Sequence, residues 1–113
     1  MELNHLHGVL YASIGKAHFS NLVDYYKSFN LSEIENINFN IIEESIKQID
    51  YVLKNPEIDL QKYCSTPYSN DILRSWLVLY RSNLEFIVDS YNQGKYKLTY
   101  EDVIEWLENR NIT

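Results

Sequence analysis

The sequence predicts an all-α protein, built as a single-domain helical bundle of about four to five helices around a central helix near residues 70–92. The length of 113 residues fits one domain spanning 1–113. Only three Gly and two Pro interrupt the chain, which favours long helices over many short strands. Several segments also repeat apolar residues at helical spacing, so each can bury one face against its neighbours.

The central helix is predicted to begin near Ser69 or Asn70 and to end at about Asn92. Apolar side chains cover most of its circumference, which is typical of a helix packed on several sides. Gly94 suits the position just after the C-cap, where a left-handed backbone is common. One polar stripe remains, with Val78 inside it, and consists of Arg74, Arg81, Glu85 and Asp89.

A second helix is predicted over residues 40–54. Asn40 is a candidate N-cap, and Glu43 three positions later completes a box-like arrangement. Asn55-Pro56 ends this helix, and Pro56 is predicted to open a short helix reaching Tyr63. Its inward side chains are predicted to be Ile42, Ile46, Ile49 and Leu53.

Two more helices are predicted, over residues 17–30 and 100–110, the latter capped by Thr99. Residues 1–16 have two readings. Leu3, Leu6, Leu10 and Ile14 have helical spacing, but glycines interrupt it. A short N-terminal hairpin in this segment would make the fold class α+β instead.

Acidic charge is concentrated in the middle of the sequence. Residues 31–60 hold seven acids against two lysines, and so carry five of the six net negative charges. Such a field attracts a basic partner and speaks against direct nucleic-acid binding, which needs a basic face. The longest apolar run, Trp76–Tyr80, is too short for a membrane span. The first residues lack the pattern of a signal peptide, and Cys64 is the sole cysteine, so we expect a cytoplasmic protein.

The acidic segment is also the predicted partner-binding surface. On a helical wheel, Glu43, Lys47 and Asp50 share one side, and Tyr51 points outward beside them as an aromatic anchor. The alternative is a solvated helix face with i,i+4 pairs, Glu43–Lys47 and Asp50–Lys54. The full predicted set is Glu33, Glu35, Glu43, Glu44, Lys47, Asp50, Tyr51, Glu57, Asp59 and Tyr63.

Ten tyrosines form the other unusual feature of the composition. Tyr26, Tyr80, Tyr91 and Tyr100 fall on apolar stripes and are predicted to be core or core-edge residues. The tyrosines that fall off these stripes would be hard to explain without a partner. They are Tyr25, Tyr51, Tyr63, Tyr68 and Tyr96.

No catalytic or cofactor-binding pattern accompanies these features. His5, His7 and His18 are too few for a zinc site, and Cys64 has only Lys62 as a basic neighbour. Three scattered glycines offer no phosphate-binding loop. We therefore expect a protein that is not an enzyme and that uses no metal and no cofactor.

The pairs Glu43-Glu44 and Asp50-Tyr51, together with the segment 57–63, resemble bacterial immunity proteins. These are small acidic inhibitors of colicin-type and contact-dependent growth inhibition toxins. The resemblance implies a monomer or weak homodimer that neutralises a cognate basic, nuclease-like toxin, without contacting nucleic acid or membrane. Two alternatives remain open: a phage-encoded inhibitor or nucleic-acid mimic, and a helical scaffold protein that self-associates through its tyrosines.

Overall fold

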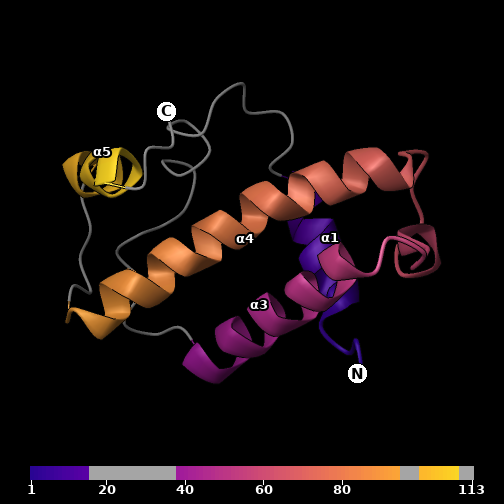
Figure 1. Ribbon diagram of the computed structural model, residues 1–113, viewed down its shortest axis with the longest axis horizontal. Helices are drawn as coiled ribbons and strands as arrows, with labels where there is room; N and C mark the ends of the chain where they lie inside the picture. The colour runs from indigo at the N-terminus through magenta and orange to yellow at the C-terminus, as the bar shows by residue number, and fades with distance from the viewer. Residues whose placement is uncertain (16–37, 95–99, 110–113) are drawn as a thin grey trace.

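The computed structural model describes residues 1–15, 38–94 and 100–109, and in these ranges the chain is all-α (Figure 1). The helices are α1 (Leu6–Gly15), α3 (Phe39–Lys54), the short 3-10 helix η2 (Leu60–Lys62), α4 (Asn70–Asn92) and α5 (Tyr100–Asn109). None of the described residues forms a strand. The predicted fold class is therefore confirmed.

Helices α3 and α4 run antiparallel, and the segment containing η2 joins them at one end (Figure 1). Helix α1 packs against both of them. Helix α5 lies beside the C-terminal half of α4, where Phe86 and Trp106 are in ring contact. The buried cluster between α1, α3, η2 and α4 contains Leu6, Val9, Leu10, Ile49, Val52, Leu60, Cys64, Leu73, Leu77 and Leu84.

The bounds of α4 agree with the sequence prediction because its end signals are local. Ser69 is the N-cap, and its hydroxyl accepts a hydrogen bond from the Ile72 N–H at 3.3 Å. Gly94 adopts φ +74°, a conformation that glycine takes without a Cβ clash. Its N–H donates to the Tyr91 carbonyl at 3.0 Å, which closes the last turn.

Helix α3 begins slightly earlier than predicted. Its N-cap is Asn38, whose side chain accepts from the Ile41 N–H, so the predicted cap at Asn40 is wrong. Both positions hold asparagine, and the cap falls on the one whose backbone is extended. Asn55 is the C-cap, as the Asn-Pro pair indicated.

The predicted helix from Pro56 to Tyr63 is also wrong in extent. Pro56 lies in a turn, and only the single 3-10 turn of η2 forms, with Asp59 as its N-cap. The side chain of Asn70 holds η2 in position. It accepts a hydrogen bond from the Leu60 N–H at 2.6 Å and donates one to Asp59 at 3.1 Å. Hydrogen bonds to α4 thus fix a segment too short to be a stable α-helix.

Residues 6–15 form a helix, so the alternative of an N-terminal hairpin is wrong. Leu6, Val9 and Leu10 are buried at i, i+3 and i+4 spacing, which places them on one face. Gly8 is exposed, and tertiary burial outweighs its low helix propensity. The predicted helix over residues 17–30 and the Thr99 cap lie outside the described residues; the predicted helix over 100–110 corresponds to α5.

Candidate interaction surfaces

The outer face of α3 presents part of the predicted partner-binding set. Its exposed side chains include Tyr51, with 37% of its surface exposed, flanked one and two turns earlier by Lys47 and Glu44. Lys47 and Glu44 form an ion pair at 3.4 Å in which both side chains remain mostly exposed. Such a pair contributes little to stability, so both groups are available to a partner.

Asp50 belongs to a different arrangement. Its two carboxylate oxygens accept from Arg81 of α4, with Nε donating at 2.5 Å and Nη2 at 3.2 Å. Arg81 also donates to Glu85 at 2.9 Å, and the carboxylates raise the pKa of its guanidinium. Asp50 therefore fastens α3 to α4. The predicted pairs Glu43–Lys47 and Asp50–Lys54 are replaced by Glu44–Lys47 and Asp50–Arg81.

The remaining residues of the predicted set are partly exposed on the surface and partly involved in holding the fold together. Glu43 and Glu57 are exposed. Asp59 is the half-buried cap of η2, and Tyr63 packs against the buried cluster while its carbonyl lies 2.9 Å from Nδ1 of His7. Glu33 and Glu35 lie outside the described residues.

Arg74 of α4 serves the C-terminal end of α3. Its guanidinium donates to three backbone carbonyls, those of Val52 at 2.5 Å, Asn55 at 3.2 Å and Ile58 at 2.8 Å. The last carbonyls of a helix lack partners within the helix and carry partial negative charge. The Arg74 guanidinium therefore provides hydrogen-bond donors to these carbonyls and reduces the negative field at the C-terminal end of α3.

The tyrosines divide only partly as predicted. Tyr51 and Tyr68 are exposed, whereas Tyr63 is packed against the core. Tyr80 also packs there, and burial raises the pKa of its phenol. Tyr91 is half-buried and stacks on Phe39 with ring centroids 4.7 Å apart. The predictions for Tyr25, Tyr26 and Tyr96 and for the side chain of Tyr100 fall outside the described residues.

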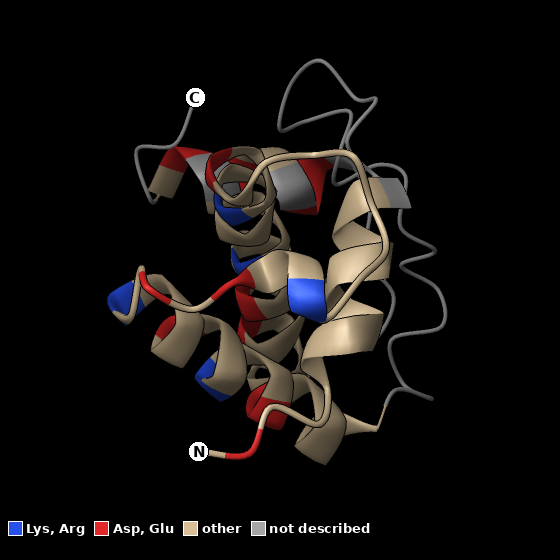
Figure 2. Ribbon diagram, turned by 90° about the vertical axis from the view of Figure 1, so that its right-hand side faces the viewer, with Lys and Arg blue, Asp and Glu red and all other residues tan. Residues whose placement is uncertain are grey.

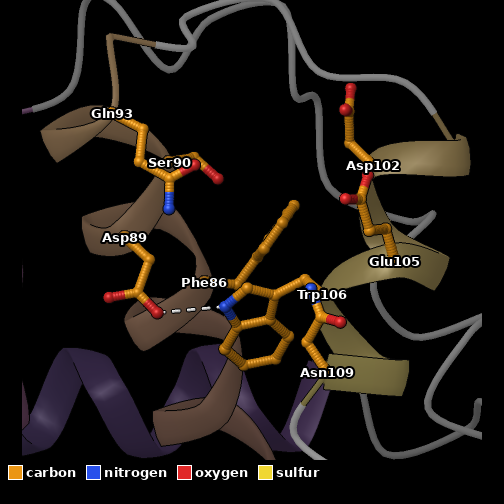
Figure 3. A pocket seen from close by; sticks show the side chains of 8 residues that line it. All are labelled: Phe86, Asp89, Ser90, Gln93, Asp102, Glu105, Trp106 and Asn109. Carbon is orange, nitrogen blue, oxygen red and sulfur yellow. Dashed lines mark hydrogen bonds between the residues drawn. The ribbon is translucent and has the colours of Figure 1, made fainter.

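A cleft that the sequence analysis missed lies between α4 and α5 (Figure 3). Its volume is about 70 Å³. The rings of Phe86 and Trp106 meet with centroids 5.3 Å apart, and the Trp106 indole N–H donates to Asp89 at 3.0 Å. Among the described residues, the lining consists of Phe86, Asp89, Ser90, Gln93, Asp102, Glu105, Trp106 and Asn109.

The cleft is strongly acidic. Helix α5 carries four acids and, as Figure 2 shows, no lysine or arginine; the acids are Glu101, Asp102, Glu105 and Glu108. Two of these acids, Asp102 and Glu105, line the cleft, and Asp89 of α4 adds a third carboxylate. The nearest basic residues along the sequence, Lys95, Lys97 and Arg110, lie outside the described residues. The available sequence signal was the return of negative charge near the C-terminal end, next to a tryptophan on a polar helix edge.

Within the described ranges, no group of three or more His, Cys, Asp and Glu side chains is placed to hold a metal ion. The same ranges contain no helix with the length and apolarity needed to cross a membrane. Cys64 is buried, which raises the pKa of its thiol. Comparison with known proteins gives no match to a family model, to a curated protein or to a solved structure.

Proposed function

We propose that this protein is an inhibitor of the immunity-protein kind, which binds and neutralises a cognate basic, nuclease-like toxin domain. The binding surface is the outer face of α3, with Tyr51 as the aromatic anchor and Glu43 and Glu44 as the charged groups that attract the partner. The inhibitor acts by occupying a surface of the toxin and carries out no chemical step.

The observation that carries this proposal is the exposure of Tyr51 among charged side chains on a helix that is firmly held. Asp50 and Val52, the neighbours of Tyr51, bind Arg81 and Arg74 of α4, so the helix presenting the tyrosine is fixed before a partner arrives. A rigid aromatic side chain with a polar tip is the kind of group that contributes most to protein interfaces. Preorganisation lowers the entropic cost of binding.

The test begins with capture of partners from the native host by the tagged wild-type protein, at low and at high salt. The double variant Glu43→Lys/Glu44→Lys is run beside it, because both carboxylates can be reversed without breaking the Asp50–Arg81 contact. We expect a basic partner to be retained by the wild type in a one-to-one complex and lost by the variant. That partner, expressed alone, should stop bacterial growth, and co-expression of this chain should restore growth.

The matched control is Glu2→Lys/Asp71→Lys, which makes the same change in net charge at two exposed positions outside α3. Equal loss of binding in both double variants would mean that overall charge, and no particular surface, controls association. A partner whose binding or toxicity is indifferent to Glu43→Lys/Glu44→Lys and to Tyr51→Ala would overturn the assignment. Recovery of the chain's own copies alone would favour a self-associating scaffold.

A further inference from the structure

The outer face of α3 carries exposed side chains at the spacing of a helix–helix interface. Its exposed residues include a series that advances by steps of four and three residues: Asn40, Glu44, Lys47, Tyr51 and Lys54. This alternation is the spacing of the two contact positions of a heptad repeat, so the five side chains form one stripe along the helix. The other side of α3 packs against α1 and α4.

The order of charges along this stripe makes it complementary to a second copy of itself. When two copies of α3 lie antiparallel about a twofold axis between Glu44 and Lys47, Glu44 of each copy faces Lys47 of the other. The ends of the stripe then meet as well, because Tyr51 faces Asn40 and the neighbouring Ile41 of the second copy. The same residues serve both copies, as a twofold interface requires.

The antiparallel arrangement also covers the large apolar side chains that α3 exposes. Ile41 is 46% exposed and Tyr51 is 37% exposed, and they lie near opposite ends of the helix. Only an antiparallel pair brings each of them beside the other across the interface. A parallel pair would set Glu44 against Glu44 and Lys47 against Lys47, which like-charge repulsion disfavours.

The charges of α3 are suited to such a contact. Glu44 and Lys47 form an ion pair at 3.4 Å within one chain, yet their side chains remain 52% and 64% exposed. A second copy therefore adds two further pairs without breaking the first two, and the four groups alternate in sign.

Balanced charge at this face removes the main obstacle to self-association. The whole chain has a net charge of −6, which keeps copies apart by general repulsion. The exposed charged residues of α3, in contrast, are two acids and two lysines: Glu43, Glu44, Lys47 and Lys54. Two copies that approach through α3 thus bring no excess of one charge into the interface.

We propose that the outer face of α3 binds a second copy of this chain as an antiparallel, twofold-symmetric helix pair. The dimer is weak, because most positions of the stripe are polar and polar contact positions set the register of a helix pair at a cost in stability. Its formation does not depend on the proposed inhibitor function. Where both hold, the toxin and the second copy compete for the same face, and the dimer dissociates before the toxin binds.

The test is sedimentation equilibrium of the purified full chain alone, in a dilution series from millimolar to micromolar concentration. We expect the average mass to approach that of two chains at the highest concentrations and that of one chain at the lowest. Circular dichroism of each variant described below checks that its helices are retained.

Charge reversal on the stripe identifies the surface and the register. Glu44→Lys and Lys47→Glu each place like charges opposite one another at both pairs, so either variant alone should associate at least about tenfold more weakly than the wild type. A one-to-one mixture of the two variants again places opposite charges at both pairs and should associate. The double variant Glu44→Lys/Lys47→Glu should associate by itself, which a parallel pair would not do.

Two matched controls make the same changes in net charge at exposed positions outside α3. They are Glu108→Lys and Lys62→Glu, and both should associate nearly as the wild type does. Equal weakening by Glu108→Lys and Glu44→Lys would overturn the proposal, since net charge rather than the stripe would then control association.

A wild-type chain that remains monomeric at millimolar concentration also overturns the proposal. So does a dimer that is indifferent to both single reversals, or a mixture of Glu44→Lys and Lys47→Glu that fails to associate, because these residues would then not face one another. No toxin is present in the experiment. A monomeric wild type therefore leaves the proposed inhibitor function standing, and failure to capture a toxin leaves the dimer standing.

Discussion

Helix α4 has neighbours of opposite electrostatic character on its two sides. Toward α3, it contributes two arginines that meet negative groups: Arg81 binds Asp50, and Arg74 binds the carbonyls at the C-terminal end of α3. Toward α5, the second half of α4 contributes Asp89 and no basic side chain, and it faces a helix with four acids. One helix therefore neutralises its first neighbour and adds to the charge of its second.

The difference between the two sides shows that the net charge of a sequence segment does not determine the electrostatic field at the surface that the segment forms. Residues 31–60 have the larger acidic excess, yet within the described part of this segment Asp50 is paired with Arg81, and Glu44 is paired with Lys47. Helix α5 has fewer acids and contains no lysine or arginine of its own. We conclude that much of the charge on the described α3 side is committed to contacts that hold the fold.

Substitution of Arg74 tests the α3 side of this comparison and is expected to cause the largest loss of stability. Arg74→Met keeps an apolar stem but removes the guanidinium from three carbonyls, of which those of Val52 and Asn55 keep a backbone N–H donor. Because these carbonyls lie at a helix end that is packed against α4, we expect the free energy of unfolding to fall by about 2 kcal/mol. Urea denaturation followed by circular dichroism measures this loss.

The control for Arg74→Met is Lys54→Met, which removes one positive charge from an exposed position in the last turn of the same helix. This substitution should change the stability by no more than about 0.5 kcal/mol. If the two variants lost the same stability, then the effect of Arg74 would come from net charge and its contacts to α3 would be unimportant.

The next largest loss of stability is expected at alkaline pH, in the buried cluster that α3 and α4 share. Burial raises the pKa of Cys64 and Tyr80 above their ordinary values of 9.0 and 10.0, so both groups hold their protons more tightly in the folded state. Their contribution is fully present below the ordinary pKa values and is lost as the pH rises past them. Stability should begin to fall near pH 9, with a limiting slope of about 1.4 kcal/mol per pH unit for each group.

Denaturation curves collected between about pH 8 and about pH 10.5 would cover both ordinary pKa values. In Cys64→Ala, the decline should begin about one pH unit later, because only Tyr80 of this pair then remains. A free energy of unfolding that stays constant through this range would show that neither group needs to remain neutral in the folded protein.

Features of the fold encoded by neighbouring residues could be predicted from the sequence. The ends of α4 follow from Ser69 and Gly94, whose effects act within one turn, and its central position follows from an apolar circumference. The start of α3 could not be chosen between Asn38 and Asn40, because both can cap a helix. At α1, burial of Leu6 and Leu10 outweighed a glycine that local propensity counts against a helix.

The candidate sites were harder to predict because they depend on residues far apart in the sequence. Asp50 and Arg81 are separated by 31 positions, and nothing in the acidic segment indicates which carboxylate would find a base. The cleft requires α5 to lie beside α4, so that Trp106 reaches Asp89 across 17 positions. Helical wheels place side chains on faces of single helices, and they cannot place two helices side by side.

A smaller effect is expected at Asn83, which lies on α4 between its two halves. Asn83 is completely buried, and neither atom of its amide has a hydrogen-bond partner. Replacing it by the similarly sized leucine removes an unsatisfied polar group, so Asn83→Leu should raise the free energy of unfolding by about 1 kcal/mol. Asn83→Asp is the matched contrast and should lower it, because burial of an unpaired charge costs more. A destabilising leucine would indicate that the amide is needed in the folded protein.

The smallest effects provide the most direct comparison of the two sides of α4. Asp50→Asn removes the charge from the carboxylate bound by Arg81, and Glu105→Gln removes a charge from an exposed residue of the cleft. The first should cost about 0.5–1 kcal/mol, because a bidentate pair is weakened at a half-exposed position. The second should cost nothing measurable, or stabilise the protein slightly, because it relieves repulsion among the acids of α5. Thermal unfolding at low and high salt separates the cases: salt should reduce the difference between wild type and Asp50→Asn, whereas it should stabilise the wild type relative to Glu105→Gln. If Glu105→Gln were the more destabilising substitution, the acids of α5 would be holding the fold, and the contrast between the two sides of α4 would be reversed.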